Sequence, residues 1–495
     1  MRNKYTLLMA TMALALSSPA FSQEKEKSWY DKVEFSGFVD VYYQYTQNNK
    51  QGATVDTSRA FETYNKQFAV NAVELDIEKL ADKESPWGFR IDFMNGQNSF
   101  AQERPFTTTN NIWNMNLLQQ AYVSMYFDVL KGLTVDAGKM ATHIGYEVLE
   151  SKDNLNYTIG YIFFNTVPFI NTGARANLQI TDTLAAGLYL YNSAQGTGFT
   201  GNGDQFGYKG LSPYGTAGSG SDIYSTTQHA YADGPNPSRT IGTQIKYDAV
   251  PDKFNIVWNT LYGNDNVKGR LTNQEVWAQG AYGAAPLRKA SNWREDYWFV
   301  NNLILSFTPN EKTLFAFDWT YGERAGQTVN AAFGWESPTY NPSAVGLPTA
   351  SALGLNETQA AYPFGRDNKI KRIYQTFGFW FKYQFTEKFS LALRHERIDD
   401  SRYGGSLVVN APLFNVTPAD RYDLQFKDAA GLRPSASSLG MIRTYTITPT
   451  FNWSENFIIK LDLRRDEGPG QQFIDEKGRP ASHQNGATLG VVAKF

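Results

Sequence analysis

Few side chains in this sequence have the types and spacing that support chemistry. Gly196, Gly198 and Gly201 match the G-x-G-x-x-G pattern of a dinucleotide-binding loop, which requires a helix directly after it. The residues that follow, NGDQFGYKGLSPYG, are typical of a loop and not of a helix. The pattern therefore indicates a polar loop rather than a nucleotide site.

Metal and acid–base chemistry have equally weak support. The chain has no cysteine and four histidines, and His143, His229, His395 and His483 do not follow the spacing of a metal site. A hydrolase with two carboxylates would fit the supply of Asp and Glu, but no such pair has a distinctive setting. We therefore predict no catalytic residue, no metal ion and no cofactor.

One acidic stripe is more distinctive. Glu74, Asp76 and Glu78 alternate with apolar residues, so they share one face of a predicted strand. Such a stripe could bind a divalent cation through its carboxylates. The alternative, which we favour, is that it lines a polar wall and pairs with Arg90 on the next strand.

The composition narrows the class of protein. The 495 residues include 46 Lys and Arg against 48 Asp and Glu, so the formal charge is −2 and the basic excess of a nucleic-acid-binding protein is missing. Aromatic residues make up 15% of the chain. The mean hydropathy of −0.44 argues against a bundle of membrane helices. The fold must therefore combine a polar average with many aromatic side chains.

The N-terminus predicts export from the cytoplasm. Arg2 and Lys4 precede a short apolar run, and small residues then fit cleavage before Gln23. We predict a signal peptide over 1–22 and a short periplasmic segment over 23–32. After the signal no run of 18 apolar residues occurs, so we expect no membrane-spanning helix.

The mature chain alternates apolar and polar residues in many short runs, which predicts β-strands. Short polar turns join seven pairs of runs, near 80–86, 128–132, 181–183, 248–252, 308–311, 386–388 and 454–456. Long polar stretches separate these hairpins, at about 141–171, 193–238, 264–294, 323–371 and 400–439, with shorter ones near 46–66, 96–116 and 467–485. Single strands at 33–45 and 486–495 bring the predicted number of strands to about 16.

Short and long connections alternate strictly, so all the long ones lie on one side of the sheet. Outer-membrane barrels have this asymmetry, with short periplasmic turns and long extracellular loops. Long unstructured connections are uncommon in compact soluble domains. We therefore predict an all-β fold: one transmembrane antiparallel β-barrel over 33–495.

The phase of the strands indicates which side chains face inward. A Lys or Arg in contact with lipid costs about 2–4 kcal/mol at mid-bilayer, so the charged face must turn to the lumen. The predicted lumen-facing charges are Arg90, Asp92, Arg175, Arg372, Lys382, Arg394, Glu396, Asp462 and Arg464. A barrel of this size with such a lining encloses water.

Two strands break the alternation, and aromatic residues gather near strand ends. We expect a β-bulge near 72–73 and a similar slip near 301–302. The aromatic residues predict two girdles at the membrane–water boundaries. They include Tyr42, Tyr43, Tyr45, Tyr122, Tyr126, Tyr189, Tyr191, Trp258, Trp298, Trp319 and Trp453.

Several segments resemble a known family. The last strand, GATLGVVAKF, ends in Phe495 and resembles the signal by which the outer-membrane barrel assembly machinery recognises barrels. The OmpL-like "putative β-barrel porins" of Gram-negative bacteria are similar to this chain in FSGFVDVYYQY (35–45), NAVELDIEKL (71–80), LLQQAYVSMY (117–126), LTVDAGKM (133–140) and, most specifically, 144–176. The resemblance covers 33–495 and implies a 16-stranded type of outer-membrane pore, with no known substrate.

In general porins the third extracellular loop folds into the barrel and narrows it, and the resemblance makes 141–171 that loop. Glu147, Glu150 and Asp153 would form the acidic side of a constriction. The basic wall opposite would hold Arg90, Arg175, Arg372, Arg394 and Arg464. Opposed charges would tune ion preference and admit polar solutes. The alternative, equally open, is that these charges pair with neighbours and hold the loop.

We therefore predict an outer-membrane porin and not an enzyme. It would be a passive diffusion channel for small hydrophilic solutes or ions. The alternative function is a surface binding protein or adhesin that acts through the long loops. The predicted partners are outer-membrane lipid, the barrel assembly machinery and the solutes, without nucleic acid; a homo-oligomer is an open alternative.

Overall fold

The computed structural model of the chain describes residues 29–47, 61–62, 64–98, 118–191, 240–263, 297–325, 371–402, 441–468, 473–477 and 480–495. The predicted signal peptide and the stretches 193–238 and 264–294 lie outside the described residues, as do most of 323–371 and 400–439.

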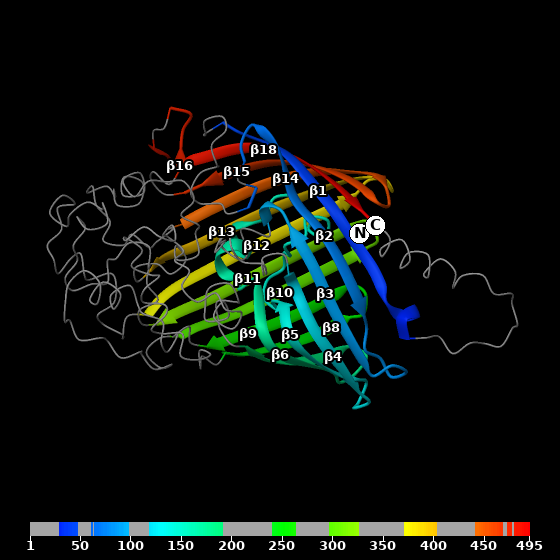
Figure 1. Cartoon of the computed structure of the whole chain (residues 1–495). Coiled ribbons are helices and arrows are strands. Elements are labelled where there is room, and N and C mark those ends of the chain that lie inside the picture. Colours follow the sequence, from blue (N-terminus) through cyan, green and yellow to red (C-terminus); the bar gives the residue numbers. More distant parts are fainter. Residues whose placement is uncertain are drawn as a thin grey trace, which may run out of the picture.

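The described strands form one closed antiparallel barrel (Figure 1), in which each strand pairs with its neighbours in sequence and β1 pairs with β18. The first eight strands are β1 (Glu34–Thr46), β2 (Gln67–Lys79), β3 (Trp87–Asn95), β4 (Leu118–Phe127), β5 (Leu133–Ala141), β6 (Ile170–Gln179), β7 (Leu184–Tyr191) and β8 (Thr240–Val250). The other eight are β9 (Phe254–Gly263), β10 (Tyr297–Asn310), β11 (Thr313–Ala325), β12 (Lys371–Gln384), β13 (Phe389–Arg402), β14 (Met441–Ser454), β15 (Phe457–Glu467) and β18 (His483–Lys494). These sixteen strands confirm the predicted fold class.

Smaller elements accompany the barrel in the described ranges. They are the 3-10 helix η2 (Trp29–Lys32), the helix α3 (Tyr161–Thr166) and a two-stranded sheet of β16 (Phe473–Ile474) and β17 (Pro480–Ala481). None of the described helices is long and apolar enough to cross a membrane.

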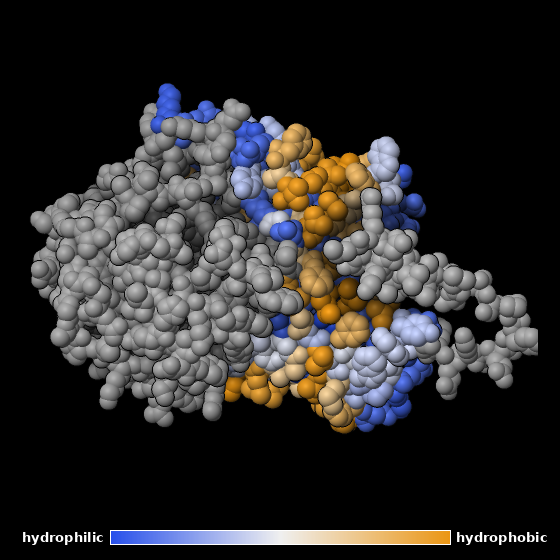
Figure 2. Space-filling model, in the orientation of Figure 1, coloured by the Kyte–Doolittle hydropathy of each residue, from blue (hydrophilic) through white to orange (hydrophobic). Residues whose placement is uncertain are grey.

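Alternation of side chains explains why these residues form a barrel wall. On β12, Thr376 and Trp380 are buried inside, whereas Phe377 and Phe379 are exposed outside. The same period of two recurs on the other strands. On the face in view, Figure 2 shows an apolar band across the described wall, bordered by a more polar rim. Such a band is the surface that a transmembrane barrel presents to lipid.

All seven predicted hairpins are present in the described residues, with boundaries shifted by a few residues. The connection between β10 and β11 is as short as 311–312. In the β4–β5 turn, Leu130 and Gly132 have positive φ angles of 54° and 129°, which reverse the chain tightly. The start of β1 and the end of β18 lie at this same short-turn rim (Figure 1).

The bulge expected near 72–73 is confirmed one residue earlier. The register of β1 with β2 shifts between Asp40 and Val41, which leaves Asn71 as the extra residue of β2. Its Nδ2 atom donates a hydrogen bond of 2.8 Å to Oδ2 of Asp40. The bulge therefore turns a polar side chain into the lumen.

The slip expected near 301–302 is wrong. β10 stays in register with β9 and β11 across these residues. Asn301 lies on the outer face, where it accepts a hydrogen bond of 2.7 Å from the indole Nε1 of Trp258. A polar residue on the lipid side is thus satisfied by an aromatic neighbour, which the alternation pattern alone does not reveal.

The girdle assignments are correct for some aromatic residues and wrong for others. Tyr43, Tyr45, Trp258 and Trp453 are exposed on the outer face. Tyr42, Tyr189, Tyr191 and Trp298 are buried within the barrel. Adjacent residues of a strand point to opposite faces, so a run of aromatic residues cannot lie wholly in a girdle. The rings of Tyr42, Tyr189 and Tyr191 pack against a chain segment inside the barrel, whereas the indole of Trp298 donates to the Tyr374 hydroxyl of β12.

Candidate functional site

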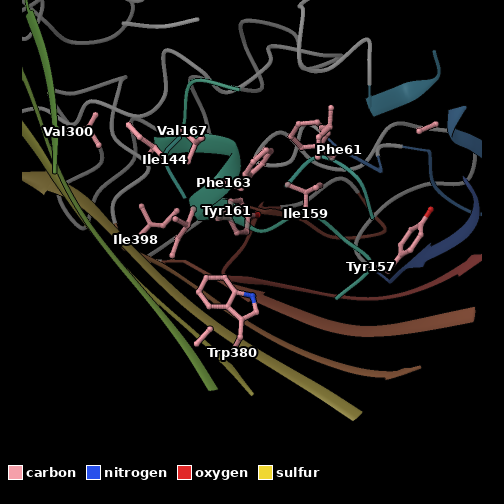
Figure 3. Close-up of a cluster of buried hydrophobic side chains, with 14 of the residues drawn as sticks. Phe61, Ile144, Tyr157, Ile159, Tyr161, Phe163, Val167, Val300, Trp380 and Ile398 are labelled. Carbon is pink, nitrogen blue, oxygen red and sulfur yellow. The ribbon is translucent and has the colours of Figure 1, made fainter. Parts of the chain in front are cut away.

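Residues 142–169, here called the inner loop, leave β5, enter the barrel and return to β6. They include α3. Figure 3 shows Tyr161 and Phe163 of this loop near Trp380 and Ile398 of the wall, within one buried apolar cluster. The loop predicted over 141–171 therefore lies inside the barrel.

The first end of the inner loop rests on β7 and β9. The imidazole of His143 stacks on the ring of Tyr189, with centroids 4.0 Å apart, and its Nε2 lies 3.0 Å from the carbonyl oxygen of Thr260. His143 lies outside the membrane-spanning strands, and burial lowers the pKa of its imidazole to about 4. The ring is therefore neutral at pH 7.

The next residues of the loop bind a polar ladder on β10 and β11. The backbone N–H of Gly145 donates to Asn302 Oδ1 at 3.3 Å, and that of Tyr146 donates to Asp318 Oδ2 at 2.9 Å. Asn302 also donates to Asp318 at 2.6 Å. Asn302 and Asp318 are thus hydrogen-bonded to each other as well as to the loop, as in other buried polar networks.

A buried ion pair joins the middle of the loop to β13. Nη1 of Arg394 lies 2.7 Å from Oε1 of Glu147, and both side chains are at most 2% exposed. Glu147 also accepts hydrogen bonds from the backbone N–H of Gly160 at 2.8 Å and from the indole of Trp380 at 3.3 Å. An isolated charge at this depth would be costly, so loss of either partner would leave the other as an unfavourable buried charge.

Glu396 holds the N-terminus of α3. Its carboxylate accepts hydrogen bonds from the backbone N–H groups of Tyr161 and Ile162, at 3.1 and 3.0 Å. These are the N–H groups that a helix leaves without internal partners. A carboxylate there also interacts favourably with the helix dipole. Glu396 of the wall therefore fixes the position of the helix.

Residues 157–159 are held by two charges of β15. Asp462 accepts from the backbone N–H groups of Tyr157 and Thr158, at 3.1 and 2.8 Å, and from the Thr158 hydroxyl at 2.7 Å. Arg464 donates to the carbonyl oxygen of Ile159 at 2.8 Å. Hydrogen bonds to charged groups are stronger than neutral ones. Both side chains are thus occupied by the loop backbone.

Residues 150 and 151 of the loop contact β1, β4 and β15. Ser151 donates from its hydroxyl to Asp40 at 2.6 Å, and its carbonyl oxygen accepts from Lys460 at 2.6 Å. Glu150 accepts from the Gln119 amide at 2.8 Å. The inner loop is therefore bound to the wall from β7 round to β1 and β4.

The opposite wall has charges of another kind. Arg90 lies 2.8 Å from Asp92 and 3.4 Å from Glu78, and Arg175 lies 2.6 Å from Asp136. The Arg90 and Arg175 side chains remain 28% and 21% exposed, in contrast with the inaccessible Arg394. Both arginines pair with carboxylates of the wall itself. The pair of Arg90 with Glu78 is the one that we predicted for the acidic stripe.

The remaining predicted site residues are dispersed. Asp153 is exposed and pairs with Lys152 at 2.5 Å. Lys382 faces the lumen from β12 and is half-buried. Arg372 belongs to β12, but its side chain lies outside the described part of the structure. In the described residues, Glu147 thus pairs with Arg394, whereas Asp153 pairs with Lys152 and with none of the predicted arginines.

Several residues that hold the loop were missed. Asp40, Asp318 and Lys460 all lie on the polar face of their strands, so their inward direction could be read from the alternation. Asn302 was misread as part of a slip. What the sequence hides is the partner, because Asp318, Lys460 and Asn302 bind backbone atoms of the loop.

Among the described residues, no group of three or more His, Cys, Asp or Glu side chains could hold a metal ion.

The family model described as "Putative beta-barrel porin-2, OmpL-like" matches residues 32–495. The chain belongs to this porin family. The family, the apolar band and the closed barrel together identify the protein as an outer-membrane porin that acts as a passive diffusion channel. They favour a channel over an enzyme and over a surface binding protein.

The porin is also similar to solved outer-membrane proteins of low sequence identity. The channel DcaP of Acinetobacter baumannii is 9% identical, with a TM-score of 0.48, over 94% of this chain and 97% of that one. OmpF of Salmonella typhi, in a complex with daunomycin, is 12% identical, with a TM-score of 0.45, over 94% and 97%. The loop L8 deletion mutant of OmpT from Vibrio cholerae is 7% identical, with a TM-score of 0.44, over 94% and 99%. No curated protein sequence matches the chain.

Proposed function

We propose that the inner loop is a fixed strut that narrows the water-filled barrel and makes the porin a filter for small hydrophilic solutes or ions. The observation that carries this proposal is the buried Glu147–Arg394 ion pair, which ties the loop to the wall across the lumen. A loop held only by exposed contacts would move aside at little cost, since exposed ion pairs contribute about 0–1 kcal/mol.

The lumen charges then divide into two groups with different tasks. Arg394, Glu396, Asp462 and Arg464 hold the loop, because their polar atoms bind it directly. Arg90, Arg175 and Lys382 act on solutes, and the exposed Asp153 lines the same path from the loop side. The buried Asp92 holds Arg90, and Glu150 helps to fasten the loop to β4. The partial exposure of the Arg90 and Arg175 side chains supports this division. Both alternatives weighed for the charges thus apply, each to its own group.

We also propose how the chain is exported and inserted into the outer membrane. Residues 1–22 are a signal peptide that is removed, and 23–32 form a short segment before the barrel over 33–495. Phe495, at the end of the strand that closes the barrel, acts as the signal for the assembly machinery. The short turns face the periplasm. A homo-oligomer through the outer face is part of the same proposal.

Conductance of the refolded mature protein in a planar bilayer tests the function. We expect steady single-channel steps, and a reversal potential under a salt gradient that gives the ion preference. Substitution of Arg90 or Arg175 should move this potential toward cation preference, and Asp153→Asn should move it the opposite way, because all three side chains are accessible from the lumen. Correctly folded barrels without any steps would contradict a channel.

A further inference from the structure

The short helix η2 lies outside the barrel, ahead of β1 at the short-turn rim (Figure 1). The indole of Trp29 packs against that of Trp87, with ring centroids 5.6 Å apart. Trp87 in turn stacks on Phe89 at 6.5 Å. Trp87 and Phe89 alternate along β3 with the lumen-facing Arg90, so they belong to its lipid-facing side. Trp29 therefore packs on the outer face of the wall.

The aromatic side chains around η2 continue the apolar band. Trp29 is 53% exposed and Tyr30 is 61% exposed, and Trp29 contacts the exposed Trp87 of the wall. Exposed indole and phenol rings that share an apolar body and a polar tip are typical of the membrane–water boundary. We call Trp29, Tyr30 and Trp87 the aromatic foot.

Lys79 gives an independent indication of the surroundings of the foot. It pairs with Phe89 across β2 and β3, so its side chain starts on the outer face, yet it is only 1% exposed. Its ammonium donates to the Ser85 hydroxyl at 2.8 Å and lies 4.2 Å from the centre of the Trp87 ring. The ammonium also donates to the carbonyl oxygen of Trp87. These contacts keep the positive charge of Lys79 away from the surface beside the foot, which suits contact with lipid.

The foot is fixed to the rim through its last residue. Nζ of Lys32 lies 3.2 Å from both Asp82 and Glu84 in the β2–β3 turn. These pairs leave no excess of positive charge for anionic headgroups. The rings of the foot, rather than its charges, must therefore provide any affinity for a membrane.

We propose that the aromatic foot binds the headgroup region of phospholipids at the short-turn rim and so fixes how deeply the barrel sits in its leaflet. The occupant is lipid because the foot is continuous, through Trp87 and Phe89, with the lipid-facing side of β3. Affinity for the bilayer depends on the rings and changes little with the fraction of anionic lipid.

The absence of cysteine from the chain makes a direct test possible, since one substitution introduces one spin label. Tyr30→Cys is labelled in the full mature porin, which is reconstituted into phosphatidylcholine vesicles with and without phosphatidylglycerol. The accessibility of the label to oxygen and to a water-soluble nickel chelate is compared by electron paramagnetic resonance. Phe35→Cys, on the lipid band, and Glu311→Cys, in an exposed turn of the same rim, are the matched controls.

We expect the label at position 30 to be more accessible to oxygen than to nickel, closer to the Phe35→Cys control, in both lipid mixtures. A value equal to that of Glu311→Cys would place the foot in water and overturn the proposal. Low accessibility to both reagents would mean that protein covers the foot, and would also overturn it. Adding Trp29→Ser to Tyr30→Cys should shift the label toward water, whereas no shift would remove Trp29 from the foot. None of these outcomes depends on conductance.

Discussion

The wall of β12–β15 and the wall of β2–β6 have the same charge pattern in sequence and use it differently. On β13 and β15, the buried Arg394 and Asp462 bind a segment from elsewhere in the chain. On β3 and β6, Arg90 and Arg175 pair with carboxylates of their own wall and stay partly exposed. A lumen-facing charge is therefore not by itself a filter charge. Its accessibility and its partner decide whether it holds structure or meets a solute.

The largest effect that would sharpen this contrast is expected from Arg394→Met. It leaves the buried Glu147 without its partner, which typically costs about 3–5 kcal/mol. We expect the inner loop to leave its place and single-channel recordings to show larger, noisier steps. The double variant Glu147→Gln with Arg394→Met should be quieter than the single one, since no buried charge is then unpaired. A single variant as quiet as the wild type would mean that the pair does not hold the loop.

A smaller effect is expected from Asp462→Asn, which keeps the shape of the side chain but removes its charge. Charged acceptors contribute about 1.5–3 kcal/mol per hydrogen bond, and Asp462 accepts two from the loop backbone. We expect brief excursions to higher conductance, counted in long recordings. Asp92→Asn is the matched control on the other wall and should leave the noise unchanged. Equal noise in the two variants would remove the distinction between the walls.

Arg175→Gln should change selectivity and not noise. Arg175 is 21% exposed but its partner Asp136 is only 5% exposed, so stability should fall by about 1–3 kcal/mol, less than for Arg394→Met. Loss of an accessible positive charge should shift the reversal potential toward cation preference. The shift is measured under a salt gradient, at low ionic strength, where screening is weakest. A noisier channel with an unmoved reversal potential would assign Arg175 to the loop-holding group instead.

The smallest effect concerns pH. The pKa of the His143 imidazole is lowered to about 4 when the loop is in place, against about 6.5 for a free histidine. The displaced loop binds more protons between these values, so docking is fully stabilised above pH 6.5 and weakens as the pH falls toward 4. We expect channel noise to rise continuously as the pH falls through this interval. His143→Gln should remove that part of the dependence, and an unchanged profile would exclude His143 as its source.

The sequence contains most of the fold but little of the inner loop's attachment. Alternation predicted the strands, the seven hairpins and the inward face of Arg394 and Asp462, because a period of two is a local property. It failed at Asn301, whose lipid-side position depends on a hydrogen bond with Trp258 from another strand.

The contacts of the loop escape such reading for two reasons. Glu147 and Arg394 are 247 residues apart, and nothing in the local pattern of either names the other. The acceptor role of Asp462 toward the N–H groups of Tyr157 and Thr158 involves backbone donors that every residue has. The charges could be placed on the lumen side, but their partners could not.

The pairing of β1 with β18 has a consequence for how the chain reaches its final state. Every other pair in the barrel joins strands that follow one another along the chain, whereas Tyr45 and Ala487 are brought together from opposite ends of it. Until that seam closes, β1 and β18 each present an unpaired edge to which a strand of another molecule can add. Pairing with another molecule therefore competes with closure of the seam for as long as these two edges are open.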